Sequence, residues 1–296
     1  MHIPAYRCIH MPIHAHTCLT SPADKATLSH TMTTMNCQTL SICNFKGGVG
    51  KSATTHALGA VLAERGHRVL LIDADPQSSL TAACGIDDAA DTSLAEVIGG
   101  TNPGTATLPD VIRHINTRLD LAPADIALAA AELGITVRLG RENLFKKALR
   151  SLDGQYDIML IDCQPSLGML TVNALVASQG VLCPTQPTAQ DLRGLSLFLA
   201  SVEQIRAELN PDLQVIGCLL TFYDKRLIHH RDAMQVMQNA GLPVMGMVPR
   251  SVRAAEAASA CLPVTTYAPD NPTSQAYRAL AERVEQWVKS AKHAKA

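Results

Sequence analysis

The sequence predicts an α/β fold with a doubly wound, mostly parallel β-sheet and helices on both faces. From residue 40 onward, short apolar runs rich in β-branched residues alternate with segments of helical spacing. Strands that are apolar along their whole length are typical of sheets covered on both sides, and the helices between them supply the crossovers that parallel strands require. No linker divides residues 35–296, so we expect a single domain there.

Five apolar runs are short enough to be strands and are bounded by turn-forming or helical segments. They cover residues 40–43, 68–72, 156–161, 180–183 and 215–220. A chain of 296 residues is long enough to bury a full core between such a sheet and its helices.

Helices are predicted where apolar residues recur three or four positions apart. Leu58, Val61 and Leu62 do so after the first strand, and Gly66 follows them as a helix stop signal. A stripe near the C-terminus predicts a last helix, and its members are Ala276, Leu280, Val284, Trp287 and Val288.

Composition excludes several classes of protein. No run approaches the roughly 20 consecutive apolar residues that span a bilayer. The formal net charge is -1, so any surface for nucleic acid must be a local patch. Nine cysteines are scattered without a C-x-x-C pair, which favours buried thiols in a reducing cytoplasm over a disulfide framework.

Residues 1–34 differ from the rest of the chain. They contain five histidines and two cysteines, show little periodicity, and lack the basic start and long apolar stretch of a signal peptide. His14, His16 and Cys18 are of types that bind metals, but structural metal sites normally need about four organised ligands. We therefore predict a disordered extension, or a stretch translated because the start codon is set too early.

A glycine-rich loop joins the first predicted strand to the first predicted helix. Its sequence is Asn44-Phe45-Lys46-Gly47-Gly48-Val49-Gly50-Lys51-Ser52, and the order strand–loop–helix is the context that a phosphate-binding loop requires. Glycines let successive backbone N–H groups curl around phosphates, and the helix N-terminus adds partial positive charge. We expect Lys51 to reach the β- and γ-phosphates of a nucleotide and the Ser52 hydroxyl to bind Mg²⁺.

The loop departs from the strict G-x-x-x-x-G-K-[ST] pattern in one place. Phe45 stands where the first glycine is expected, and a second lysine, Lys46, precedes the paired glycines. This variant resembles the deviant Walker A family of P-loop ATPases, which includes ParA partition ATPases, MinD and the nitrogenase iron protein. The resemblance implies that Lys46 reaches across a nucleotide-sandwich homodimer to the partner's phosphates. A cation delivered in trans stabilises charge on the transferring phosphoryl group, as an arginine finger does.

Two predicted strands end in carboxylates. Asp73 and Asp75 follow the second strand in the sequence D-A-D-P-Q, and Asp162 follows the strand over 156–161. Ligands of open parallel sheets bind outside the carboxyl ends of the strands, where a carboxylate can hold Mg²⁺ or orient a water. The stretch with Asp73 and Asp75 matches the D-x-D-P-Q pattern of ParA-like proteins. The stretch ending at Asp162 resembles Walker B, with Gln164 where that family usually has a proline.

The resemblance thus implies a set of site residues for ATP and Mg²⁺. The catalytic residues are Lys46, Lys51 and Asp75, with Asp75 positioning or activating the water. The metal-binding residues are Ser52, Asp73 and Asp162. The nucleotide-binding residues are Gly47, Gly48, Val49, Gly50, Lys51, Ser52 and Ala53, with Pro249 and Arg250 near the base.

The resemblance covers nearly all of residues 39–290 and points to the ParA/Soj branch, whose arginines help form a basic surface on the ATP dimer. The matching positions here are Arg226 and Arg253. Lys225 and Arg231 extend this patch, as do His229 and His230 if they are protonated. Lys/Arg contacts to the backbone of double-stranded DNA are sequence-independent and salt-sensitive.

The function that this resemblance implies is ATP-dependent partitioning of a chromosome or plasmid. ATP closes a dimer that binds DNA nonspecifically, and hydrolysis, which is slow until a ParB-like adaptor stimulates it, releases the DNA. We expect a cytoplasmic protein that associates with the nucleoid in its ATP state and does not bind membranes. Residues 1–34 are too few for the helix-turn-helix domain of some partition ATPases, so we expect no operator binding.

Three alternatives remain open. A MinD-like positioning ATPase would use a C-terminal amphipathic helix at a membrane, and Lys289, Lys292 and Lys295 lie beside the C-terminal apolar stripe. An iron–sulfur carrier would need cysteines such as Cys84 and Cys163 as ligands. A module that binds nucleotide without turnover is the third alternative, and the full set of lysines and aspartates argues against it.

Overall fold

The computed structural model describes residues 37–86, 92–99 and 106–293, and side chains as far as residue 291. The described residues belong to one compact unit, Thr34–Ala296. Residues 1–34, with His14, His16 and Cys18, lie outside the described residues, so the extension expected there stays a prediction.

The described residues form a sheet of eight strands in the order β3-β4-β2-β5-β1-β6-β7-β8. All neighbouring strands are parallel except β3 and β4 at one edge. The strands are β1 (Gln38–Ile42), β2 (Val69–Ala74), β3 (Arg113–Asn116), β4 (Leu119–Ala122), β5 (Ile158–Cys163), β6 (Gly180–Thr185), β7 (Gln214–Tyr223) and β8 (Val244–Pro249). The predicted doubly wound, mostly parallel sheet is therefore confirmed.

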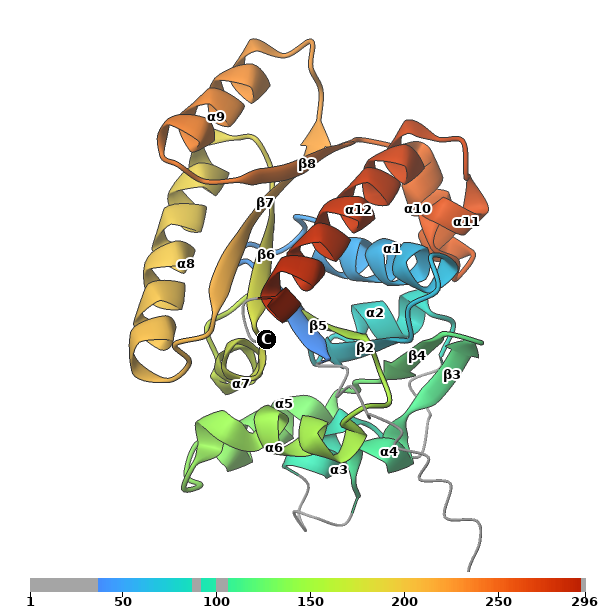
Figure 1. The fold of residues 1–296 in the computed structure, drawn as a ribbon, viewed down its shortest axis with the longest axis vertical. Helices are drawn as coiled ribbons and strands as arrows, with labels where there is room; N and C mark the ends of the chain where they lie inside the picture. Colours follow the sequence, from blue (N-terminus) through green and yellow to red (C-terminus); the bar gives the residue numbers. More distant parts are fainter. Residues whose placement is uncertain (1–36, 87–91, 100–105, 294–296) are drawn as a thin grey trace, which may run out of the picture. The chain divides into compact units, whose positions relative to one another are not determined.

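Helices cover both faces of this sheet, each over its own apolar layer. One face carries α1 (Lys51–Glu64), α2 (Ser79–Ala83), α10 (Val252–Ser259), α11 (Val264–Tyr267) and α12 (Pro272–His293). The other carries α3 (Leu94–Ile98), α4 (Leu108–Val111), α5 (Ala127–Ile135), α6 (Leu144–Leu149), α7 (Met169–Ala177), α8 (Ala189–Glu208) and α9 (Ile228–Asn239). Two 3₁₀ turns, Arg141–Asn143 and Arg150–Leu152, flank α6. Figure 1 shows α12 lying against α1.

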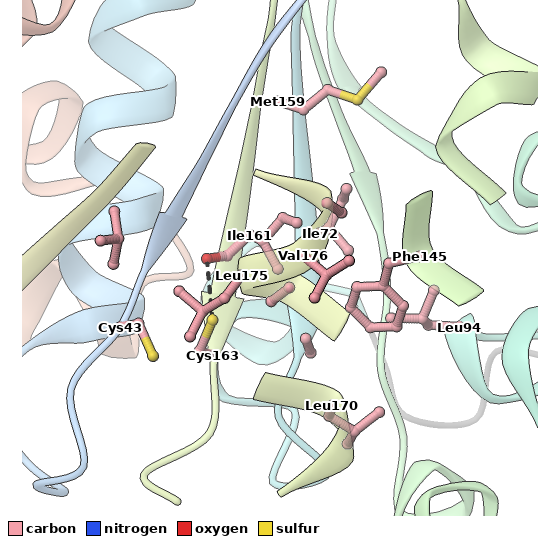
Figure 2. Close-up of a cluster of buried hydrophobic side chains, with 14 of the residues drawn as sticks. Cys43, Ile72, Leu94, Phe145, Met159, Ile161, Cys163, Leu170, Leu175 and Val176 are labelled. Atoms are coloured by element: carbon pink, nitrogen blue, oxygen red, sulfur yellow. Dashed lines mark hydrogen bonds between the residues drawn. The ribbon is translucent and has the colours of Figure 1, made fainter. Parts of the chain in front are cut away.

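The layer under α7 lies directly behind the ends of the central strands. Figure 2 shows Ile72 of β2, together with Ile161 and Cys163 of β5, near Leu175 and Val176 of α7. The Cys163 thiol donates to the Ile161 carbonyl oxygen, with 3.8 Å between sulfur and oxygen. This packing supports the expectation of buried thiols and gives the strand ends a rigid backing.

The C-terminal apolar stripe packs on the domain. Leu280, Val284 and Val288 of α12 are buried, and α12 lies against α1. Trp287 covers the start of β6, where Gly180 leaves room for its ring. None of the helices in the described part of the chain is both long and apolar enough to cross a membrane.

Two sheet edges depart from the sequence-based expectation. β8 is not among the strands predicted from the sequence, and it contains Gly246 and Pro249, residues that are depleted in strands. An edge strand tolerates proline because the missing N–H need not pair with a neighbour. The short β3–β4 ladder is antiparallel and contains an irregularity between His114 and Asn116.

Substitution of two glycines tests this packing. A Cβ atom at Gly180 would lie 2.7 Å from Trp287 Cζ2 and 2.9 Å from Ile216 Cγ2. We expect Gly180→Ala to lower the free energy of unfolding by about 1–3 kcal/mol, because overpacking forces neighbours to shift. Urea unfolding followed by circular dichroism, without nucleotide, measures this change.

Gly194→Ala is the matched control. Gly194 lies inside α8 with nothing within 4 Å of an added Cβ, so alanine should raise the free energy of unfolding by about 0.5–1 kcal/mol. A Gly180→Ala protein as stable as the unmodified chain would contradict the packing of α12 described above.

Candidate functional site

The glycine-rich loop leaves β1 between β5 and β6, where successive crossovers diverge to opposite sides of β1. Gly48 and Gly50 have φ angles of 71° and 85°, a left-handed conformation that strains any residue with a Cβ. Val49 between them is fully buried and anchors the loop. No side chain caps the first turn of α1, so its backbone N–H groups are available to an anion. This cradle fits a phosphate group.

The first half of the loop is attached to the β6–α8 segment. The Asn44 amide donates to the Pro184 carbonyl oxygen over 2.8 Å and its oxygen accepts from the Lys46 N–H over 3.2 Å. Phe45, which stands in place of the usual glycine, packs edge-on against Phe198 of α8 with ring centroids 5.0 Å apart. The half of the loop that departs from the usual glycine pattern is thus packed against α8.

The two loop lysines have different surroundings. Lys51 is buried and its amine donates to the Lys46 carbonyl oxygen over 3.1 Å. The amine of Lys46 instead lies 2.8 Å from a carboxylate oxygen of Asp191 in α8. The structure therefore brings the backbone of Lys46 to Lys51, while the side chain of Lys46 pairs within its own chain.

Asp73 and Asp162 are paired by the register of β2 and β5, which places the two carboxylates side by side at the strand ends. Both are fully buried. Burial raises the pKa of Asp73 to about 6, against hydrogen bonds from the Thr81 N–H and hydroxyl that favour its charged form. Burial and the neighbouring Asp73 raise the pKa of Asp162 well above its usual value. Keeping two adjacent buried carboxylates charged therefore costs free energy, and a bound cation would lower that cost.

One oxygen of Asp162 is an orphan. Its Oδ1 accepts from the Thr55 hydroxyl over 3.3 Å, whereas its buried Oδ2 has no hydrogen-bond partner. The nearby Ser52 hydroxyl favours the charged form of Asp162 and so opposes the rise of its pKa. A hard divalent cation fits the set of Ser52, Asp73 and Asp162, because such ions prefer oxygen ligands.

Such a site would not be an all-protein cage. No group of three or more His, Cys, Asp or Glu side chains in the described ranges is arranged to hold a metal by itself. Mg²⁺ usually takes one or two carboxylates and completes its shell with phosphates and waters. The predicted metal residues therefore suit a metal that arrives with a nucleotide.

Asp75 lies at the mouth of this acidic pair and is 9% exposed. Its N–H donates to Asp73 over 3.1 Å, and its Oδ1 accepts from the Gln77 N–H over 2.9 Å. The bond from Gln77 fixes the direction of the Asp75 carboxylate, and the bond to Asp73 fixes the backbone of Asp75. Its role with an attacking water stays a prediction.

Ser52 and Ala53 begin α1 beside the acidic pair. Ser52 is partly exposed and Ala53 is exposed, and both line a cavity of about 190 Å³ with His56. Burial lowers the pKa of His56 to about 4, so this imidazole is neutral at pH 7.

Pro249 and Arg250, the residues expected near the base, line a hollow of about 1000 Å³ together with Arg226. The Arg250 guanidinium lies 5.1 Å from the centre of the Phe222 ring. Arg253 follows at the start of α10. The structure thus gathers the expected base-binding residues and one expected DNA-binding arginine around a single hollow.

Both candidate DNA-binding arginines are in exposed ion pairs. Arg226 Nε lies 3.2 Å from Asp224, and Arg253 Nη1 lies 2.8 Å from Glu256. Exposed pairs of this kind contribute little to stability, so a phosphate can replace the carboxylate at small cost.

His230 does not extend this patch as expected. It is buried, and its Nδ1 accepts from the Asp224 N–H over 2.9 Å. Burial, followed by the neighbouring His229, lowers the pKa of His230, so it adds no charge at pH 7. Lys225 and Arg231 are exposed and remain available.

Several residues of the site were not expected from the sequence. Gln164, in place of the family's usual proline, donates to Glu132 over 2.9 Å, and the same Glu132 oxygen accepts from the Leu170 N–H. The loop after β5 is therefore fastened by a hydrogen bond rather than stiffened by a ring. Asp191 was also missed, although Thr188-x-x-Asp191 is a visible capping pattern.

The cysteines considered as cluster ligands are poorly placed for one shared between subunits. Cys163 is buried in the core. Cys84 is partly exposed, but burial of its thiol raises the pKa to about 12, which opposes the thiolate form that binds metals.

Comparison with known proteins places this geometry in a family. The model of the AAA domain family matches residues 37–215. The chromosome-partitioning ATPase Soj of Thermus thermophilus is 38% identical over 255 residues, which are 85% of this chain and 97% of Soj. The chromosome partitioning protein ParA of Caulobacter vibrioides is 38% identical over 250 residues, 83% of this chain and 92% of ParA.

Solved structures share the fold. Cobyrinic acid a,c-diamide synthase from Mycobacterium smegmatis with bound ADP and magnesium is 36% identical, with a TM-score of 0.76 over 86% of this chain and 96% of that one. The cell division ATPase MinD of Pyrococcus furiosus has a TM-score of 0.70 over 84% of this chain and 99% of its own. At 24% identity, the second likeness shows the fold alone.

The buried acidic pair predicts a pH-dependent stability. The raised pKa of Asp162 means that the folded chain holds its proton more tightly than the unfolded chain, so the stability from this group is present at low pH and lost as pH rises through the folded pKa. Without nucleotide and Mg²⁺, we expect Asp162→Asn to raise the free energy of unfolding at pH 8 by about 1 kcal/mol or more.

The stability that Asp162→Asn gains over the unmodified chain should shrink as the pH falls toward 5, through the pKa of Asp73 at about 6. Urea unfolding at pH 5, 6, 7 and 8 measures it, with the exposed Asp212→Asn as the control for charge. An Asp162→Asn protein that is less stable at pH 8 would contradict the charge repulsion inferred here.

Proposed function

The chain belongs to the ParA/MinD family of P-loop ATPases, and we propose that it is an ATP-dependent DNA-partitioning switch. The observation that carries this proposal is a phosphate cradle with a second lysine, Lys46, beside an acidic pair with an orphaned carboxylate oxygen. ATP and Mg²⁺ are its cofactors. ADP and magnesium are bound in the solved structure that is 36% identical to this chain.

The loop binds and orients the nucleotide. Its backbone N–H groups, the first turn of α1 and the amine of Lys51 hold the β- and γ-phosphates, where a buried cation acts strongly. The Ser52 hydroxyl, Asp162 and Asp73 would hold Mg²⁺, which would supply positive charge next to the phosphate oxygens.

Asp75 positions the attacking water. Its Oδ1 is held by the Gln77 N–H, which fixes the carboxylate and leaves its second oxygen to accept from a water. A carboxylate in this position orients the nucleophile or takes its proton.

Lys46 completes the site of a second copy. In the proposed ATP-bound homodimer, its amine crosses to the partner's phosphates and stabilises the charge of phosphoryl transfer. Hydrolysis is slow in the single chain because that cation is absent, and dimerisation and turnover are therefore coupled. A switch with slow turnover keeps its ATP state long enough to act.

Dimerisation gives the chain a surface for DNA. Arg226 and Arg253 are exposed, and two copies double their number, so nonspecific binding to double-stranded DNA rises with ATP. A ParB-like adaptor on the cargo stimulates hydrolysis and releases the dimer. The names of the Soj and ParA relatives support chromosome partitioning as the process. In this proposal the protein acts in the cytoplasm, and its ATP state associates with the nucleoid.

A MinD-like positioning ATPase is the alternative, since the fold is shared. The apolar stripe of α12 is buried against the domain, which argues against its use at a membrane. Co-sedimentation with anionic liposomes in the presence of ATP distinguishes the two: pelleting with vesicles but not retention on DNA would favour the alternative.

Substitution of Asp75 and Lys46 tests the ATPase. We expect Asp75→Ala and Lys46→Gln each to lower ATP turnover by about 100-fold or more, because each removes a group that acts on the transferring phosphoryl or its nucleophile. Phosphate release measures turnover, and binding of a fluorescent ATP analogue checks that the site still forms. Unchanged turnover in Lys46→Gln would contradict the trans role of this lysine.

Charge reversal of two arginines tests the DNA surface. We expect Arg226→Glu with Arg253→Glu to abolish most ATP-dependent DNA binding at about 150 mM salt while ATP binding survives. The slope of log K against log salt should fall by about 2 or more, since each lost phosphate contact removes about one unit.

The matched control is Lys146→Glu with Lys147→Glu on α6, which makes the same change in net charge. Fluorescence anisotropy with a DNA duplex at two salt concentrations measures both proteins. Equal losses in the two double variants would show that net charge, rather than the surface near the hollow, governs binding.

A further inference from the structure

The amine of Lys46 is held by its own chain. Its Nζ lies 2.8 Å from Asp191 Oδ1, and the side chain of Asp191 is 0% exposed while that of Lys46 is 40% exposed. Among the described residues this is the only ion pair of Asp191. A buried carboxylate without a cation is strongly unfavourable, so Lys46 is the group that compensates Asp191.

The surroundings of Asp191 explain why it stays in place. Asp191 lies in the first turn of α8, where its N–H donates to the Thr188 hydroxyl over 3.2 Å. The Thr188 hydroxyl in turn donates to Asp191 Oδ2. Oδ2 is therefore occupied by the helix cap, and Oδ1 faces Lys46 without another hydrogen-bond partner.

Neighbouring contacts hold the backbone of Lys46 against the same segment. Phe45 packs on Phe198 of α8, and the Gln186 amide donates to the Gly48 carbonyl oxygen over 3.2 Å. Lys46 thus has a backbone fixed on both sides, and its side chain is the part that can change partners.

We propose that Asp191 holds Lys46 in an intramolecular position and so sets the threshold for ATP-dependent dimerisation. The inference rests on the proposed function, in which Lys46 acts on a second copy. An amine 2.8 Å from Asp191 within its own chain has to leave this carboxylate before it contacts the phosphates of another chain. Leaving Asp191 buried and unpaired opposes dimerisation, and only a ligand with several negative oxygens compensates for that loss.

The proposed restraint and a plain helix cap require different properties of the side chain at position 191. A cap needs only the hydrogen bonds to Thr188, which an asparagine at position 191 can keep. The restraint needs the negative charge. Asp191→Asn therefore removes the hold on Lys46 and leaves the start of α8 intact.

The experiment is sedimentation velocity of the full chain with Mg²⁺ and a non-hydrolysable ATP analogue, over a range of protein concentrations. We expect Asp191→Asn to lower the dissociation constant of the dimer by about ten-fold or more, because neither copy then has to break a buried ion pair. Asp212→Asn, an exposed carboxylate shortly after α8, makes the same charge change and should leave the constant unaltered.

The Lys46→Gln background separates the two claims. There, Asp191→Asn should have no further effect, since the amine it restrains is gone. If a mixture of Lys46→Gln and Asp75→Ala chains recovers no ATP turnover, the trans-lysine of the proposed function is wrong. If that mixture recovers turnover but Asp191→Asn fails to strengthen the dimer, the restraint is wrong while the proposed function stands.

A thermal unfolding scan without nucleotide accompanies each variant. If Asp191→Asn unfolds, Asp191→Ser serves in its place: serine also removes the negative charge and is smaller than aspartate, so the dimer constant should also fall. Equal dimer constants for a folded Asp191→Ser protein and the unmodified chain would overturn the proposal.

Discussion

Two buried carboxylates at adjacent strand ends are the constraint on which the site depends. The register of β2 and β5 sets Asp73 beside Asp162, and neither can be moved without shifting a central strand. Burial raises both pKa values, and the neighbouring carboxylate of Asp73 raises the pKa of Asp162 further. The nearby amine of Lys51 favours the charged form of Asp162 but is a single charge against two. A nucleotide that arrives with a divalent cation therefore stabilises the folded chain, which is the thermodynamic basis of a ligand-dependent switch.

The same loop connects this site to the rest of the molecule. Its second half enters α1 and bears Lys51, while its first half rests on α8 through Phe45 and Lys46. A ligand that draws Lys46 away alters the contact with α8, whereas one that engages only Lys51 does not. In the proposed function, the two lysines have different roles: Lys51 binds the nucleotide of its own chain, and Lys46 responds to a second chain.

Much of this arrangement follows from local sequence. Continuous apolar strands, the glycine spacing and carboxylates after Ile72 and Ile161 are local patterns, and together they predict the sheet and the phosphate site. The edge strand β8 was not predicted because Gly246 and Pro249 are poor strand formers, and only pairing with β7 makes this segment a strand. The pairing of Lys46 with Asp191 and the burial of His230 depend on contacts between distant segments. The spacing of apolar residues along the chain does not reveal such contacts. The capping pattern that begins at Thr188 indicates only that the side chain of Asp191 is held at the start of α8.

Mixing two inactive chains tests the central claim most directly. A chain with Lys46→Gln keeps Asp75 but donates no lysine, and a chain with Asp75→Ala donates the lysine but cannot position the water. Mixed dimers contain one complete site, so an equimolar mixture should recover about a quarter of the turnover of the unmodified protein, measured as phosphate release with Mg²⁺ and ATP. A mixture as inactive as its components would contradict the claim that Lys46 serves the site of another chain.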